Sequence, residues 1–162
     1  MSKYEIYTDG SAIGLTRNYY GGWAAIVQKD NKIIDILKGS KFPSTNNEME
    51  LTAIKNAVLY IKSSTNHCAF GNSYIIYTDS QYSLSSVTTW CHQWRNNGWK
   101  NSKKEPVKNK EIIEEIMNLL EENPLIEIKK VKGHNGNIGN EMADDYATDE
   151  SNKLKAEIER SK

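Results

Sequence analysis

The sequence predicts an α/β fold, with a mixed five-stranded sheet flanked by helices on both faces. Three segments rich in β-branched and aromatic residues come first with no long helical pattern between them, and two more follow, each after a helical pattern. The five expected strands span residues 4–8, 23–28, 33–38, 74–78 and 125–131. The turn at 29–32 predicts an antiparallel hairpin, whereas helical crossovers predict that strands one, four and five are parallel.

Helical patterns are expected from about residue 44, over 80–90, over 109–122 and from about residue 139. At the start of the first pattern, Thr45 and Glu48 fit a capping box, in which each side chain satisfies an exposed amide. The apolar stripe of this helix includes Ile54 and Ile61, and Glu50 lies one turn before Ile54 on the same face. We therefore expect Glu50 to point inward. A buried Glu paired with a Lys or Arg is the alternative.

The composition predicts a single globular domain of a protein that works inside the cell. The chain has 162 residues and a formal net charge of +0, so any basic contact surface must be local. No apolar run approaches the roughly 18 residues of a membrane span, so no membrane contact is expected. Cys68 and Cys91 lack metal or redox spacing, which predicts reduced thiols in a cytoplasmic protein. We expect a monomer with one domain at 1–150 and a charged tail at 151–162, which either continues the last helix or frays.

The tripeptide Tyr-Thr-Asp ends two of the expected strands, at Asp9 and at Asp79. Gly10 and Ser11 are expected to break the first strand directly after Asp9. If the two strands are parallel neighbours, both carboxylates lie at the edge where open α/β sheets bind ligands. Close carboxylates repel unless a cation compensates, and oxygen ligands favour Mg²⁺ or Mn²⁺. The alternative is a pair of solvated aspartates that initiate turns.

A basic segment with interleaved tryptophans covers residues 92–110. From Arg95 onward the segment contains one acid, Glu105. Its cations are Arg95, Lys100, Lys103, Lys104, Lys108 and Lys110. Such a segment is typical of a phosphate-binding surface, and a solvated basic loop is the alternative. Core packing is the favoured interpretation for Trp90 and Trp94, and less so for Trp99.

The order of these motifs resembles that of type 1 ribonuclease H, the bacterial-like enzyme that cuts the RNA strand of RNA–DNA hybrids. The resemblance runs from about Tyr4 to Ala147 and rests on the combination of motifs, each of them weak alone. The motifs are Tyr-Thr-Asp-Gly-Ser at 7–11, Thr-Asn-Asn-Glu-Met-Glu-Leu at 45–51, Thr-Asp-Ser-Gln-Tyr at 78–82, Trp90, Trp94, Gly-Trp-Lys at 98–100, Pro-Val-Lys-Asn at 106–109, Val-Lys-Gly-His at 131–134, Asn140-Glu141 and Asp144.

The resemblance implies a ribonuclease H-like fold, a catalytic domain at 1–150 and an endoribonuclease that leaves a 5′-phosphate and a 3′-hydroxyl. Two Mg²⁺ ions, with Mn²⁺ as a substitute, would lie about 3.5–4 Å apart and share Asp9. The implied metal ligands are Asp9, Glu50, Asp79 and Asp144. Helical phase does not choose between Asp144 and Asp145, and the spacing of the family selects Asp144. His134 would assist proton transfer and product departure, and a solvated loop His is the alternative.

Substrate contacts also follow from the resemblance. Gly10, Ser11, Asn46 and Gln81 correspond to residues at the minor groove and the ribose 2′-hydroxyls, which distinguish RNA from DNA. Asn47 corresponds to a residue at the DNA strand, and Thr45 and Asn109 correspond to a pocket for a DNA phosphate. Trp90, Trp99 and Lys100 correspond to residues of a basic protrusion. Two departures weaken this set. Pro43 stands where the family often has an Arg, and the loop at 13–20 is longer than the bacterial pattern and lacks its Asn-Pro-Gly run.

Two other functions remain compatible with the same fold. One is a DNA nuclease of the resolvase, transposase or exonuclease type, which the basic segment and the motif at 45–51 disfavour. The other is a non-catalytic hybrid-binding module, which the presence of all four carboxylates and His134 disfavours. A free-standing enzyme is expected rather than a segment of a reverse transcriptase, because Met1 precedes a complete domain.

Overall fold

The computed structural model describes residues 1–15, 18–64, 71–131 and 137–161. One sheet has the strand order β3-β2-β1-β4-β5. The strands are β1 (Lys3–Leu15), β2 (Asn18–Lys29), β3 (Lys32–Lys41), β4 (Ser73–Thr78) and β5 (Ile126–Lys130). β1, β4 and β5 are parallel, whereas β2 is antiparallel to both of its neighbours. The predicted mixed five-stranded sheet and its strand directions are therefore confirmed.

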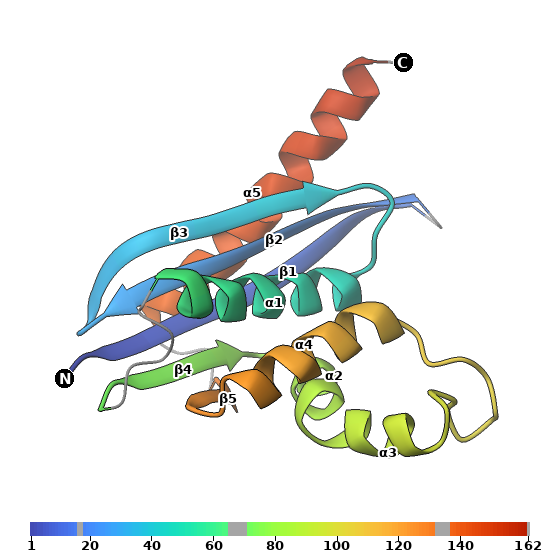
Figure 1. Cartoon of the computed structure of the whole chain (residues 1–162). Helices are drawn as coiled ribbons and strands as arrows, with labels where there is room; N and C mark the ends of the chain where they lie inside the picture. Colours follow the sequence, from blue (N-terminus) through green and yellow to red (C-terminus); the bar gives the residue numbers. More distant parts are fainter. Residues whose placement is uncertain (16–17, 65–70, 132–136, 162) are drawn as a thin grey trace.

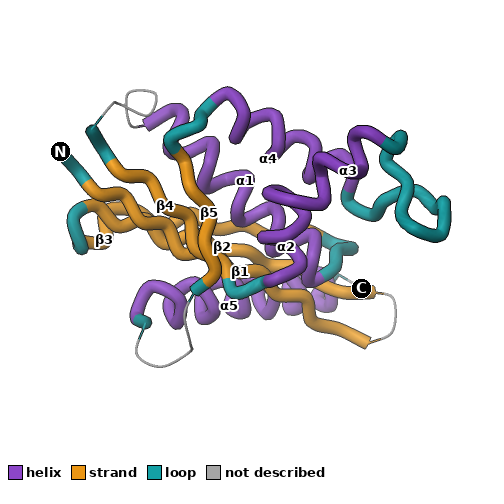
Figure 2. Tube along the Cα trace, turned by 90° about the horizontal axis from the view of Figure 1, so that it is seen from below, coloured by secondary structure: helices purple, strands orange, loops and turns teal. Residues whose placement is uncertain are grey.

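Helices cover both faces of this sheet, as predicted. α1 (Asn46–Ser64) and α4 (Lys110–Glu122) lie on one face, and α5 (Ile138–Arg160) lies on the other, against β1, β2 and β3 (Figures 1 and 2). Between β4 and α4 come α2 (Gln81–Ser85), the π-helical segment η1 (Ser86–Trp90) and α3 (Cys91–Asn96). The single helix expected over 80–90 is therefore wrong in extent, because helical structure continues to Asn96 with a π-helical middle.

Alternate residues of β1 enter two separate cores, as the two-residue period of a strand requires. Ile6 packs with the α1 and α4 side chains, among them Ile54 and Ile113, and all three are completely buried. Tyr7 instead packs in a smaller cluster with Ala143 of α5. Burial of each such isoleucine contributes about 1.5–3 kcal/mol, so the two layers fix the position of β1 from both sides.

β1 is longer than predicted, and the loop expected before β2 is a hairpin. Gly10 pairs with Trp23 and Leu15 pairs with Asn18, so Gly10 and Ser11 do not end the strand. Antiparallel pairing satisfies their backbone groups and overrides the local breaker signal. The parallel pairing of β1 with β4 nevertheless stops at Tyr7. Asp9 therefore lies where β1 parts from β4, and not at the end of β1.

The start of α1 forms only half of the predicted capping box. The amide of Glu48 donates a 3.1 Å hydrogen bond to Thr45 Oγ1, as expected. The Glu48 carboxylate, however, accepts hydrogen bonds from Lys41 Nζ and from Ser44 Oγ. A cation at the end of β3 thus replaces the backbone amide as its partner, and this lowers the pKa of Glu48 despite partial burial.

α5 begins at an asparagine cap and continues to the end of the described chain. Asn137 Oδ1 accepts a 3.0 Å hydrogen bond from the amide of Asn140. Of the two alternatives for the charged C-terminal residues, the helical continuation is observed, since α5 extends to Arg160. Within the described ranges, no helix combines the length and the apolarity that crossing a membrane requires.

Gly10 permits a direct contact between β1 and the first turn of α1. A Cβ added at Gly10 would lie 2.3 Å from the amide nitrogen of Glu50 and 2.5 Å from the carbonyl carbon of Met49. Both atoms are backbone, so a side chain at this position forces α1 away from the sheet.

We predict that Gly10→Ala lowers the free energy of unfolding by about 1–3 kcal/mol, the usual cost of overpacking. The measurement is equilibrium unfolding in urea, followed by circular dichroism. A variant as stable as the parent would show that α1 can shift away from Gly10 without a loss of free energy of unfolding.

Candidate active site

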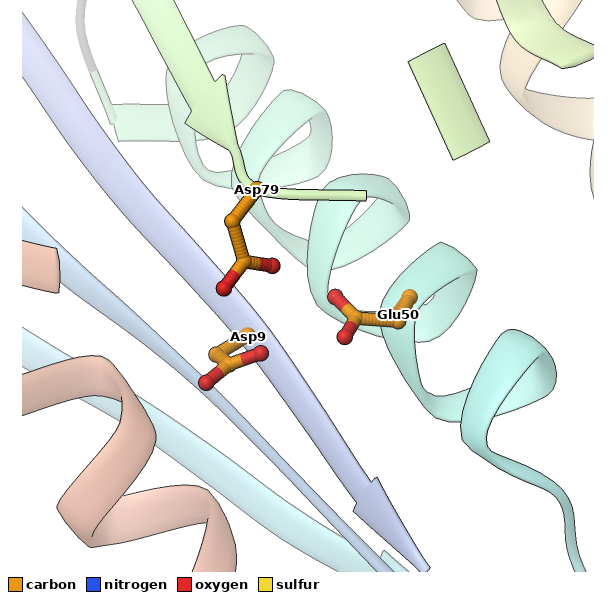
Figure 3. Close-up of side chains that lie close together, drawn as sticks. All are labelled: Asp9, Glu50 and Asp79. Atoms are coloured by element: carbon orange, nitrogen blue, oxygen red, sulfur yellow. The ribbon is translucent and has the colours of Figure 1, made fainter. Parts of the chain in front are cut away.

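Three carboxylates from separate elements converge at the point where β1 and β4 part. Asp9 comes from β1, Asp79 directly follows β4, and Glu50 comes from the start of α1. One oxygen of each lies within 4.8 Å of one oxygen of the other two. Figure 3 shows the three side chains directed toward a common centre. Asp9 is buried, whereas Glu50 and Asp79 are partly buried.

The repeated Tyr-Thr-Asp sequence sets the register that brings Asp9 beside Asp79. Tyr7 pairs with Tyr77 in the parallel ladder, and their rings stack with centroids 4.8 Å apart. Thr8 Oγ1 donates a 2.7 Å hydrogen bond to the Tyr77 carbonyl, which continues the contact one residue further. Asp9 and Asp79 therefore each come two residues after the last pair of the parallel ladder, Tyr7 with Tyr77. The amide of Gly10 also donates to Asp9 Oδ1 at 2.9 Å.

Burial and mutual repulsion oppose ionisation of this cluster. Burial, followed by the charge of Asp79, raises the pKa of Asp9 well above its ordinary value. Burial also raises the pKa of Glu50 strongly, and the charge of Asp9 adds to that shift. Between the ordinary and the raised pKa values, and without a compensating cation, the folded state therefore binds more protons at this site than the unfolded chain does.

The oxygen atoms of the cluster fit a divalent cation. Glu50 Oε2 is buried and accepts no hydrogen bond, which is costly for a carboxylate oxygen unless another partner binds it. In the described part of the chain, no Lys or Arg forms an ion pair with Asp9 or Glu50. The alternative of a Glu50 paired with a basic side chain is thus not observed there. An all-oxygen set with net negative charge matches Mg²⁺ or Mn²⁺.

Asp144 faces the same region from α5, and Asp145 does not. Asp144 lines a cavity of about 360 Å³ together with Asp79, Asn140 and Glu141. A hydrogen bond with its carboxyl group also raises the pKa of Asp9. Asp144 and Asp145 are both exposed, but Asp145 does not line this cavity. Of the two, Asp144 shares the cavity with Asp79, and its role as a metal ligand stays a prediction. His134 lies outside the described residues.

Several of the expected substrate-binding residues line cavities, two of which lie at the start of α1 and one of which lies beside α3. A cavity of about 550 Å³ is lined by Thr45, Asn47 and Asn109, and the substrate contacts implied for these residues stay predictions. Asn46 joins Thr45 and Asn47 in a second cavity of about 400 Å³. A third, also of about 400 Å³, contains Trp90 and Lys100.

The other expected contacts lie outside these cavities. Gly10 and Ser11 are on β1, and Gln81 is the first residue of α2, where its side-chain amide donates to Ser85 Oγ.

One expectation about the basic segment is wrong, and one of its cations has a partner within the protein. Trp99 was expected to be the least core-like of the three tryptophans, but it is 8% exposed and belongs to the main core, whereas Trp90 is 39% exposed. Arg95 is engaged on α4, where Nη2 lies 2.7 Å from Glu121 Oε1. In the described part of the chain, no ion pair involves Lys100 or Lys108. The same holds for Lys103, Lys104 and Lys110, so Arg95 is the one cation of this segment with an ion-pair partner among the described residues.

Sequence reasoning missed several residues that line these cavities. Tyr82 carried no expected role but lines the cavity of about 550 Å³ with Asn109, whose side-chain amide donates to Tyr82 Oη at 3.3 Å. Lys108 lines the same cavity and was expected only as a cation of the basic segment. Both adjoin assigned residues in short motifs, a signal that was present in the sequence. Tyr19 lines the second cavity with Asn46, but its segment was expected to be a loop, so no pattern indicated its position.

The raised pKa values of Asp9 and Glu50 predict how stability depends on pH. Their ordinary values are 3.8 and 4.5, so above about pH 4 the metal-free folded state binds more protons than the unfolded state. Stability from this site therefore falls as pH rises toward 8, by about 1.4 kcal/mol per pH unit for each retained proton. Asp9→Asn removes part of the repulsion, so its stability relative to the parent should grow between pH 5 and 8.

The measurement is urea unfolding of the parent and of Asp9→Asn in EDTA, at steps from pH 5 to 8. The comparison of the two proteins cancels titrations elsewhere in the chain. A difference that stays constant or shrinks with pH would contradict the assigned repulsion. Addition of Mg²⁺ at pH 8 should stabilise the parent more than the variant.

Comparisons with known proteins identify the family of this chain. A family model described as RNase H matches residues 1–152. "Ribonuclease H" of Treponema pallidum is 38% identical and covers 89% of this chain and 88% of its own length. "Ribonuclease H" of a Wolbachia strain from Drosophila simulans is 42% identical, and the match covers 91% of this chain and 95% of the relative. A solved foamy viral protease-reverse transcriptase in complex with RNA/DNA hybrid shares the fold, with a TM-score of 0.78 and 24% identity. The match covers 93% of this chain and 20% of that one. The chain belongs to the ribonuclease H family of hydrolytic nucleases.

Proposed function

We propose that this protein is an endoribonuclease that hydrolyses the RNA strand of RNA–DNA hybrids in a Mg²⁺-dependent reaction. The observation that carries the proposal is the convergence of Asp9, Glu50 and Asp79 within 4.8 Å, with one buried Glu50 oxygen left without a partner. Family membership supplies the reaction class, and Asp144 supplies a fourth carboxylate beside the same cavity. Mn²⁺ is the expected substitute because it prefers the same oxygen ligands.

In this proposal, Asp9, Glu50, Asp79 and Asp144 would hold two divalent ions. Such ions activate a water and stabilise the leaving 3′-oxygen, which yields a 5′-phosphate and a 3′-hydroxyl. The role of the protein is to hold the carboxylates in fixed positions despite their repulsion, and a bound cation would favour their deprotonated forms. We assign proton transfer and product departure to His134, whose ordinary pKa lies near 6.5.

The hybrid is proposed to bind across the start of α1. Thr45 and Asn109 line the cavity of about 550 Å³ with Lys108, a combination of hydroxyl, amide and ammonium donors that suits a DNA phosphate. Thr45 Oγ1 accepts a bond from the Glu48 amide, so its hydroxyl hydrogen remains available to a phosphate oxygen.

The remaining contacts are assigned by strand. Asn46, Gln81, Gly10 and Ser11 are proposed for the RNA strand, and Asn47 for the DNA strand. Trp90, Trp99 and Lys100 are proposed for the basic protrusion, although the burial of Trp99 restricts it to a supporting role.

We further propose that residues 1–150 constitute the catalytic domain of a monomer in the cytoplasm, followed by a charged tail. The three converging carboxylates come from one chain, which supports a monomeric site. The free, buried thiol of Cys91 is compatible with a reducing compartment. Light scattering after gel filtration tests the monomer directly.

The deciding experiment is cleavage of end-labelled RNA–DNA, DNA–DNA and RNA–RNA duplexes with Mg²⁺ or EDTA. We expect cleavage of the RNA strand of the hybrid with Mg²⁺ only. Cleavage of the DNA duplex would instead favour a DNA nuclease, and binding without cleavage would favour a hybrid-binding module. The matched pair Asp144→Asn and Asp145→Asn tests the fourth ligand, and we expect at least a hundredfold loss of kcat in the first and little change in the second.

We predict that the lysines of the protrusion contribute affinity and not chemistry. Changing Lys100, Lys103 and Lys104 together to alanine should raise KM for the hybrid and leave kcat nearly unchanged, because uniform binding is lost. The slope of log Kobs against log salt should also flatten, by up to about 0.9 per lost phosphate contact. Steady-state kinetics and binding titrations at several salt concentrations measure both quantities.

The matched control removes three lysines elsewhere, at Lys32, Lys153 and Lys155, and so lowers the total charge equally. An equal change of slope in this control would mean that only net charge matters. A fall in kcat without a change in KM would assign the protrusion to the chemical step.

A further inference from the structure

Asn140 is a buried amide beside the acidic cluster that the proposed mechanism does not use. It is 5% exposed, and its Oδ1 is buried without a hydrogen-bond partner. Its backbone amide donates to the cap residue Asn137, but no described residue bonds to its side chain. An unsatisfied buried amide oxygen costs about 1–3 kcal/mol, so its retention in a helix requires an explanation.

The surroundings of Asn140 indicate what its partner must be. Asn140 lies one helical turn before Asp144, and both line the cavity of about 360 Å³ with Asp79 and Glu141. The three acids offer only acceptor oxygens when they are ionised. A ligand of this cavity must therefore bring positive charge and hydrogen-bond donors together. A phosphate group offers neither, and a lone ribose hydroxyl offers one donor and no charge.

A hydrated divalent cation meets both requirements. Mg²⁺ keeps several of its waters when it binds to proteins, and each bound water is a strong donor. We propose that Asn140 is a positioning residue for the metal, whose Oδ1 accepts a hydrogen bond from a water bound to the cation beside Asp79 and Asp144. This inference rests on the proposed metal-dependent function.

An amide suits this position better than a carboxylate. Burial and the charge of Asp79 raise the pKa of Asp9, and burial and the charges of Asp9 and Asp79 raise that of Glu50, so a further anion would add repulsion. A neutral amide adds an acceptor without adding charge. Outer partners of this kind orient the metal and its waters, and their loss typically weakens metal affinity by 10–100-fold.

The test measures metal binding without substrate. Mn²⁺ is titrated into the full chain, and the free ion is counted by electron paramagnetic resonance at constant ionic strength. Asn140→Leu keeps the size of the side chain and removes the acceptor, so we expect Mn²⁺ affinity to fall 10–100-fold. Asn140→Asp keeps an acceptor oxygen in the same shape, so its affinity should equal or exceed that of the parent.

Thermal melts in EDTA separate this role from a structural one. Because Asn140→Leu removes an unsatisfied buried oxygen, its metal-free Tm should equal or exceed that of the parent. Ser151→Ala is the control, since Ser151 is a fully buried polar residue of α5 that does not line the cavity. It should leave Mn²⁺ affinity unchanged.

The possible outcomes distinguish this inference from the proposed function. If the parent binds Mn²⁺ and cuts the hybrid while Asn140→Leu binds Mn²⁺ equally well, the role of Asn140 is refuted and the proposed function stands. A lower Tm with unchanged affinity would identify a purely structural residue. If the parent neither binds Mn²⁺ nor cuts the hybrid, both proposals fail.

Discussion

Repulsion among three carboxylates is the constraint on which the arrangement of this protein depends. Ligand oxygens of Asp9, Glu50 and Asp79 lie within 4.8 Å of one another in a partly buried site, where burial and neighbouring charge oppose ionisation of Asp9 and Glu50. Rigid elements hold them there, because β1 and β4 are locked by a parallel ladder and α1 is pressed against the backbone at Gly10. Hydrophobic layers on both faces of the sheet supply the free energy that offsets this local cost.

Much of this site could be predicted from the sequence because its determinants are local and periodic. The repeated Tyr-Thr-Asp pattern marks two strands that part at the same level, and helical phase directs Glu50 inward from Ile54. The extension of β1 was not predictable in this way. Gly10 and Ser11 carry a local breaker signal, and only pairing with β2 satisfies their backbone groups. The capping box failed for a similar reason, since Lys41 lies close to Glu48 only after β3 has formed.

The availability of charges on the surface also depends on contacts that the sequence does not show. The basic segment reads as a uniform run of cations, yet Arg95 is bound to Glu121 on another helix. Its lysines project from a loop in which the backbone of Trp99 has a φ of 62°, while the Trp99 ring enters the core. Burial of this ring anchors the loop and leaves the exposed Trp90 beside Lys100. The sequence therefore indicates the existence of a basic surface, and tertiary contacts select its members.

The distribution of unsatisfied atoms adds an independent argument for a cation site. Among the described residues, the buried side-chain atoms without hydrogen bonds are Glu50 Oε2, Asn140 Oδ1 and the hydroxyl oxygens of Ser83 and Ser86. The two serines belong to α2 and to the π-helical η1 that follows it, away from the regular helices α1 and α5. The other two belong to regular helices on opposite faces of the sheet, α1 and α5, and both adjoin the acidic cluster. Regular structure gives no reason to leave an acceptor unpaired in either helix. A hydrated cation at the acidic cluster would give that reason, because it would supply donors to the unpaired oxygens and offset the carboxylate charge.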